Sequence, residues 1–113
     1  MKPEEFIKAL KNEIVDNSVS IYKQTLDTTN VEVAKDKYWI ELLKFYKNLS
    51  GKDKILLLSI VREVSIDSIA TMLGALDGVS TLDGIGCDYV LEVEGRKING
   101  NLLELFLELA EKE

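Results

Sequence analysis

Apolar residues near the start of the chain recur three and four positions apart, which is the spacing of one face of a helix. These residues are Phe6, Leu10, Ile14 and Ile21, with Ile7 beside them. The pattern predicts a helix over residues 3–28. Weak helix formers at residues 16–20 favour a bend in it, and residues 27–30 have the composition of a loop.

Two further helices are predicted over residues 33–49 and 52–76. The first has an apolar face and a face of lysines. The second is apolar on most sides in its first half, so we expect it to be the central and most buried helix. Ser50 can cap it, residues 65–68 could split it, and Gly78 suits the position just past its end.

The period of the pattern changes in the last third of the chain. Residues 89–94 alternate between apolar and polar side chains, as in a half-buried strand. Glu94 and Gly95 suit a tight turn, after which residues 96–98 would pair back as a second strand. A third short strand is expected at residues 79–82. The last helix, over residues 102–111, begins with a capping-box pattern of Asn101 and Glu104.

These elements predict one mainly helical α+β domain over residues 1–113. It has three N-terminal helices, a small antiparallel β-hairpin or meander, and a C-terminal helix. Because a lone hairpin is marginally stable, it should pack on the helices. The expected core is Phe6, Leu10, Ile14, Trp39, Leu43, Leu58, Val61, Leu73, Leu91, Val93, Leu105 and Phe106.

The composition narrows the classes of function. The chain has no histidine and one cysteine, so it lacks the commonest general base and the usual zinc ligands. We therefore expect no enzyme activity, no catalytic residue, no metal and no cofactor. No apolar run is long enough to span a membrane, and the first residues do not form a secretory signal. These features predict a cytoplasmic protein that does not bind membranes.

Weaker candidates for chemistry lie in the glycine-rich stretch at residues 77–88. Asp77, Asp83 and Asp88 lack the alternate spacing of a calcium loop, and Asp-Gly pairs are typical of turns. The Gly84-Ile85-Gly86 segment lacks the strand before and the helix after that a phosphate-binding loop needs. Cys87 has acids as its nearest charges, which disfavour a reactive thiolate, so we expect a semi-buried structural residue.

Paired carboxylates and aromatic residues also have simpler interpretations. Glu92 and Glu94 share one face of a strand, and Glu104 and Glu108 share one side of a helix. Neither pair is placed across a cleft, as glycosidase chemistry requires. The aromatic residues fall mostly at core spacing in an acidic chain, so direct binding of nucleic acid is not expected.

The acidic residues are unevenly distributed. Residues 1–64 carry eleven Lys/Arg and ten Asp/Glu, a net charge of +1, whereas residues 65–113 carry three and ten, a net charge of −7. A field of one sign accelerates encounter with an oppositely charged surface, although acids can also serve only to keep a surface solvated. The candidate partner-binding residues are Asp83, Asp88, Glu92, Glu94, Glu104 and Glu108, with Tyr89 as an aromatic anchor.

The sequence of residues 76–108, LDGVSTLDGIGCDYVLEVEGRKINGNLLELFLE, resembles the C-terminal part of small bacterial immunity-type proteins of polymorphic or contact-dependent toxin systems. The resemblance rests on the turn glycines, the Lys97-Ile98-Asn99-Gly100 element and the Leu-Phe-Leu helix. It implies a non-catalytic antidote that covers a cognate, basic toxin domain. The alternative is a helical scaffold or regulatory adaptor, which could be a homodimer; the sequence leaves the oligomeric state open.

Overall fold

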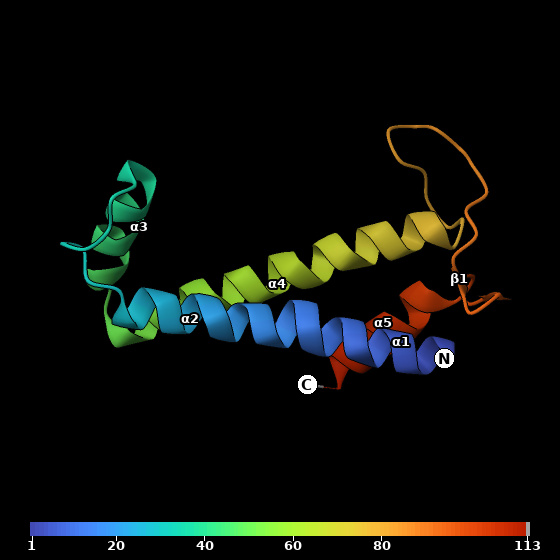
Figure 1. Cartoon of the computed structure of the whole chain (residues 1–113), viewed down its shortest axis with the longest axis horizontal. Helices are drawn as coiled ribbons and strands as arrows, with labels where there is room; N and C mark the ends of the chain where they lie inside the picture. The colour runs from blue at the N-terminus through green and yellow to red at the C-terminus, as the bar shows by residue number, and fades with distance from the viewer. Residues whose placement is uncertain (113) are drawn as a thin grey trace.

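The computed structural model describes residues 1–112 as an elongated helical molecule of 50 × 30 × 25 Å. One continuous helical rod consists of α1 (Pro3–Leu10), the π-helix η1 (Lys11–Asn17) and α2 (Ser18–Thr28). It runs antiparallel to the long helix α4 (Gly51–Leu76) (Figure 1). Helix α3 (Lys37–Lys47) lies at one end of this pair, and the C-terminal helix α5 (Leu102–Glu111) lies at the other. The predicted mainly helical fold is confirmed.

The rod buries a different stripe from the predicted one. Ile7, Lys11 and Val15 are buried, whereas Ile14, which was expected in the core, is 40% exposed. The weak helix formers at residues 16–20 do not interrupt the helix; instead the π-helical turns of η1 end at Asn17. The sequence pattern missed Lys11 because lysine counts as a charged residue. Its four-carbon chain is nevertheless apolar and packs in the buried stripe.

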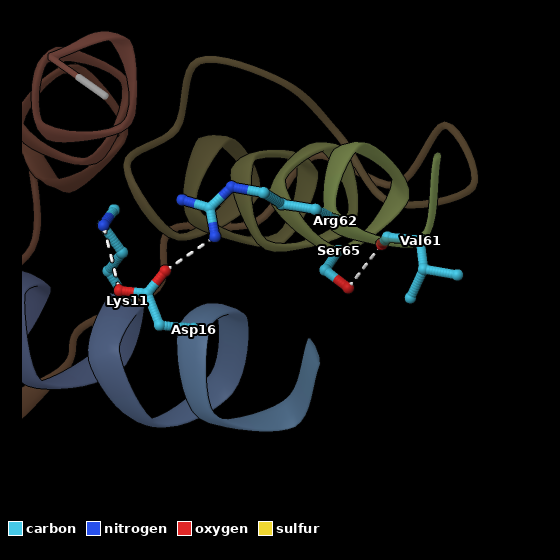
Figure 2. Close-up of polar contacts among 5 residues, drawn as sticks. All are labelled: Lys11, Asp16, Val61, Arg62 and Ser65. Atoms are coloured by element: carbon cyan, nitrogen blue, oxygen red, sulfur yellow. Dashed lines mark hydrogen bonds and ion pairs between the residues drawn. The ribbon is translucent and has the colours of Figure 1, made fainter. Parts of the chain in front are cut away.

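A polar network joins the rod to α4 near its middle. The Asp16 carboxylate accepts hydrogen bonds from Lys11 Nζ at 3.1 Å and from Arg62 Nη1 at 2.7 Å (Figure 2). Burial of the carboxyl raises the pKa of Asp16, but the two charged donors outweigh it and hold the pKa below its ordinary value. Asp16 is therefore ionised at neutral pH, as an acceptor between two cations has to be.

Helix α3 begins four residues later than predicted. The Asp36 side chain accepts a hydrogen bond from the Tyr38 N–H and caps the helix, while the Val33 N–H donates to Asn30 O in a preceding turn. The sequence pattern missed this start because Val33 and Ala34 continue the apolar spacing. α3 packs through a group that we call the α3 cluster, which comprises Leu26, Leu43, Tyr46 and Leu58.

Helix α4 is unbroken over 26 residues. The Ser50 cap is confirmed, since Ser50 Oγ accepts from the Asp53 N–H at 3.1 Å. The expected split at residues 65–68 is wrong: Ser65 Oγ donates to Val61 O within the same helix (Figure 2). Gly78 follows the helix with φ +78°, which is the left-handed conformation predicted for it.

A second apolar group, which we call the α5 cluster, lies at the other end of the molecule. Its buried members come from the rod, the end of α4 and the start of α5: Ile7, Val15, Ile69, Leu73, Leu102 and Phe106. The predicted core residues Leu43, Leu58, Leu73 and Phe106 are confirmed as buried. Seven others are half-buried: Phe6, Leu10, Trp39, Val61, Leu91, Val93 and Leu105.

The hairpin is shorter than predicted. β1 (Glu92–Val93) pairs antiparallel with β2 (Arg96–Lys97), whereas residues 89–91 are not part of the strand. The turn at Glu94 and Gly95 is confirmed, with φ values of 53° and 80°. The strand expected at residues 79–82 is wrong, because only an isolated bridge from Leu82 to Ile85 forms in that loop.

Asp77 and Asn99 fasten the hairpin and α5 to the end of α4. The Asp77 carboxylate accepts from the Gly100 N–H at 2.6 Å and from the Leu103 N–H at 2.7 Å. Asn101, predicted as the cap of α5, makes no capping hydrogen bond with its side chain. The distant Asp77 therefore takes over this role, which local spacing could not reveal.

Candidate partner-binding surface

The predicted binding residues all lie at one end of the long molecule, which we call the acidic end and define as α1 together with residues 77–112. In Figure 1 this end holds the loop that follows α4, the hairpin, α5 and the N-terminus. It carries ten Asp/Glu and four Lys/Arg, a net charge of −6. By contrast, residues 18–58, which form α2, α3 and the start of α4, carry a net charge of +2. The structure thus gathers the acids rather than scattering them.

Asp83 lies at the tip of the exposed loop over residues 78–90. Asp83 and Gly84 both have positive φ, and the Ile85 N–H donates to Leu82 O, so the Asp-Gly pair makes a tight turn as its composition indicated. Cys87 is exposed in the same loop, which corrects the expectation of a semi-buried residue.

Asp88 and Tyr89 line a shallow depression of about 350 Å³ at the base of this loop. Its walls also include Asp77, Lys97 and Asn99. Tyr89 is 36% exposed, so part of this residue is accessible to solvent. Asp77 and Asn99 are engaged in the hydrogen bonds that hold the loop ends, so they shape this depression.

Glu92 and Glu94 are exposed on the hairpin, while Leu91 and Val93 are half-buried and Leu91 packs against the α5 cluster. Glu92 lies directly opposite Lys97 in the strand register. Within residues 1–112, neither glutamate forms an ion pair with this lysine or with Arg96. The hairpin is therefore a mixed surface of four charged side chains, and its field is weaker than the count of acids suggests.

Glu104 and Glu108 are exposed on α5. Glu108 borders an open groove of about 240 Å³ between α1 and α5, whose floor includes Ile7, Leu105 and Leu109. Lys112 Nζ lies 3.7 Å from Glu108, an exposed contact that contributes little. The groove brings Glu4 of α1 beside Glu108, a neighbour that a division of charge by residue number could not find.

Within residues 1–112, no three of the His, Cys, Asp and Glu side chains come close enough together to hold a metal ion. Over the same residues, no helix combines the length and apolar character needed to cross a membrane.

A second surface, which sequence analysis placed in the core, lies between α2 and α3. Tyr22 and Trp39 stack with ring centroids 6.4 Å apart, and Tyr38 meets Trp39 edge-on at 6.3 Å. Tyr22 and Trp39, together with Ile21 and Thr25, line a depression of about 260 Å³. Tyr22 and Tyr38 are exposed, because α3 contacts only the end of the rod and leaves their outer sides uncovered.

Comparisons of the chain with protein-family models, with curated proteins and with solved structures find no match. The function is therefore inferred from the chain's own residues and from where the fold places them.

Proposed function

We propose that this chain is a non-catalytic cytoplasmic binding protein that docks its acidic end on a cationic protein surface. The observation that carries the proposal is the gathering of Glu92, Glu94, Glu104 and Glu108 at the end of net charge −6. These four side chains are exposed on short, well-fastened elements. Charges held in this way steer a positive partner and disfavour a negative one.

Apolar surface lies among these charges and supports a docking role. The α1–α5 groove exposes carbon atoms of Leu105 and Leu109 beside Glu108, and Tyr89 is accessible near the hairpin. Protein interfaces combine a central apolar or aromatic contact with a polar rim. The acidic end offers both parts within one region of the molecule.

A basic toxin domain is the partner class that we propose, following the immunity-type resemblance of residues 76–108. Toxins that act on nucleic acids need a positive surface to bind phosphates. An acidic protein that covers this surface would block the substrate by steric exclusion and by matching its charge. No covalent step is required of the chain in this mechanism.

The proposal is tested by two variants that change the net charge from −6 to zero in different places. One reverses three acids of the acidic end (Glu92→Lys, Glu94→Lys and Glu104→Lys). The other reverses three exposed acids elsewhere (Glu13→Lys, Glu32→Lys and Glu41→Lys). Each immobilised protein captures partners from the source lysate, mass spectrometry identifies them, and interferometry measures association at low and high salt.

We expect the acidic-end variant to associate about tenfold more slowly with the captured partner, and with a flatter salt dependence. The control variant should keep the wild-type on-rate within about twofold. Expression of the partner alone should arrest growth, and co-expression of the wild-type chain should restore it. Equal on-rates for the two variants would refute the role of the acidic end, and a harmless partner would refute the immunity function.

A helical scaffold or regulatory adaptor is the second candidate function. The observation that favours it is the amount of apolar surface that α3 and α4 leave exposed, including Phe45, Ile55 and Ile60. An adaptor would use such surface to join other proteins. A partner that binds the wild type and both charge variants equally well would favour this function.

A further inference from the structure

The first half of α4 carries a row of exposed apolar side chains along one face. Leu56, Ile60 and Val64 follow one another at four-residue spacing and are 53%, 61% and 58% exposed. This corrects the expectation that α4, whose first half is apolar on most sides, is the most buried helix. The row faces away from the rod, because helical geometry places it opposite Leu58 and Ile69, two of the five buried residues of α4.

Two segments flank this row, namely α3 and the loop after α4. We call these segments the walls and the space between them the cradle. In Figure 1, α3 rises from one end of α4 and the loop after α4 rises from the other end, both on the side away from the rod. A helix that is apolar around its circumference is normally covered on all sides. The radius of gyration, 17.7 Å, also exceeds the roughly 13 Å of a compact chain of this length, so the elongated molecule leaves more of α4 uncovered than a compact one would.

We propose that a second copy of this chain covers the row in an antiparallel, two-fold dimer centred near Ile60. In this arrangement Leu56 of one copy lies beside Val64 of the other, and Ile60 lies beside its own counterpart. A two-fold interface joins the same patch on both copies, so the patch has to be complementary to itself. The charges of the two walls of the cradle meet this requirement.

The wall at the α3 end is basic and the wall at the loop end is acidic. Residues 29–54 carry six lysines and four acids, a net charge of +2. Residues 77–91 carry three aspartates and no base, a net charge of −3. Antiparallel packing places the basic wall of each copy against the acidic wall of the other, whereas parallel packing would place walls of the same charge together. The antiparallel arrangement also brings Asp53 of each copy beside Asp67 of the other, a repulsion that the two wall contacts have to offset.

The area required for a stable dimer also points to this arrangement. A standard interface takes about 800 Å² from each partner. α4 is about 39 Å long and about 10 Å wide, so its face supplies about half of that area. The walls can supply the rest through exposed apolar side chains, which are Tyr38 and Phe45 on α3 and Val79, Leu82, Ile85 and Val90 in the loop. The acidic wall shares Asp83, Asp88 and Tyr89 with the acidic end of the proposed function. The two proposals are still tested separately, since Glu92, Glu94 and Glu104 lie outside this interface.

The oligomeric state is measured by light scattering coupled to size-exclusion chromatography. We expect the wild type to have twice the chain mass of 12.7 kDa at the highest soluble concentration. Ile60→Asp places two like charges at the two-fold axis and should give a monomer. Ile21→Asp is the matched control, because Ile21 has a similar exposure on α2 and should leave the dimer intact. Circular dichroism confirms that each variant is folded.

Charge variants and cross-linking test the orientation. Asp83→Lys with Asp88→Lys should weaken dimerisation about tenfold, whereas Glu92→Lys with Glu94→Lys changes the same net charge and should leave it within about twofold. With Cys87→Ser as background, a mixture of Leu56→Cys and Val64→Cys chains should form a disulfide between the two, while neither variant cross-links to itself. A monomeric wild type would overturn the proposal, and so would self-cross-linking of Leu56→Cys.

Discussion

At the residue scale, Asn99 makes the contacts that hold the C-terminal third together. Its side-chain nitrogen donates to Leu76 O at 2.6 Å and to Tyr89 O at 2.8 Å, and its oxygen accepts from the Leu91 N–H at 2.8 Å. One amide thus joins the end of α4, the base of the loop and the approach to the hairpin. Few side chains offer donors and an acceptor together, so substitution leaves some of these backbone groups without a partner.

We expect Asn99→Ala to lower the free energy of unfolding by about 1–3 kcal/mol, because partly buried backbone groups lose their hydrogen bonds. Urea denaturation measures this change, and limited proteolysis should show faster cleavage within residues 78–90. Asn101→Ala is the matched control, since the Asn101 side chain makes no capping hydrogen bond. Equal stability of the two variants would contradict the role of Asn99.

Some residue roles could not be predicted from the sequence because they depend on distant partners. Asp77 was assigned to a turn and lies in the turn that follows α4, whereas no role was assigned to the side chain of Asn99. However, their hydrogen bonds span up to 26 residues along the chain, so local spacing contains no signal for them. Ser50 and Gly78 were predicted correctly because capping and the end of a helix are local events.

At the element scale, a hydrogen bond from Tyr46 fastens α3 to the rod. Tyr46 Oη donates to Asp27 Oδ1 at 2.6 Å, and this bond to a carboxylate, together with burial of the ring, raises the pKa of Tyr46 to about 12. The pKa of Asp27 is held below its ordinary value by hydrogen bonds from Lys23 and then from Tyr46. The bond therefore needs a neutral phenol and an ionised carboxyl.

We expect Tyr46→Phe to lower the free energy of unfolding by about 1–2 kcal/mol at neutral pH. Because the folded pKa of Tyr46 is raised, its contribution is complete below the unfolded value of about 10 and is lost as the pH rises toward 12. The contribution of Asp27 is complete above its ordinary pKa and is lost as the pH falls below it. The difference between wild type and variant should thus shrink at both extremes.

Chemical denaturation across the pH range measures this difference. Tyr38→Phe is the control, because the Tyr38 hydroxyl makes no hydrogen bond within residues 1–112 and its ring is exposed. Its stability should follow that of the wild type at every pH. A Tyr46→Phe difference that stays constant up to pH 12 would show that the phenol stabilises α3 by packing alone.

The order and type of the main elements followed from the sequence, but several of their limits did not. Helical spacing and a hairpin turn are local signals, so the helices and the turn at Gly95 were predicted correctly. At the start of α3, the Asp36 cap competes with a longer helix that would begin at Val33. At residues 79–82, a local turn competes with a strand. A pattern of apolar residues cannot decide that competition.

At the scale of the whole molecule, the chain has two apolar cores rather than one. The α3 cluster and the α5 cluster share no residue, and the polar network of Lys11, Asp16 and Arg62 lies on the helices that run between them. The sequence predicted a single core because periodicity shows which face of a helix is buried, and not which end of it meets which partner. For the same reason the sequence predicted the group of acids in the last third of the chain, but it did not predict that Glu4 of α1 lies at the same end.

This division makes a prediction about cooperativity, which a matched pair of substitutions can test. Leu43 of the α3 cluster and Leu73 of the α5 cluster are both fully buried leucines, so truncation to alanine should cost about 2–5 kcal/mol in either place. Native-state hydrogen exchange then locates the loss. Leu43→Ala should release the amides of α3 and the first turns of α4, while α5 keeps its protection. Leu73→Ala should release α1, the end of α4 and α5 together, because these three elements share that cluster. If Leu43→Ala accelerated exchange in α5 as much as in α3, the long helices would have to transmit the loss across the polar network, and the two cores would be one folding unit.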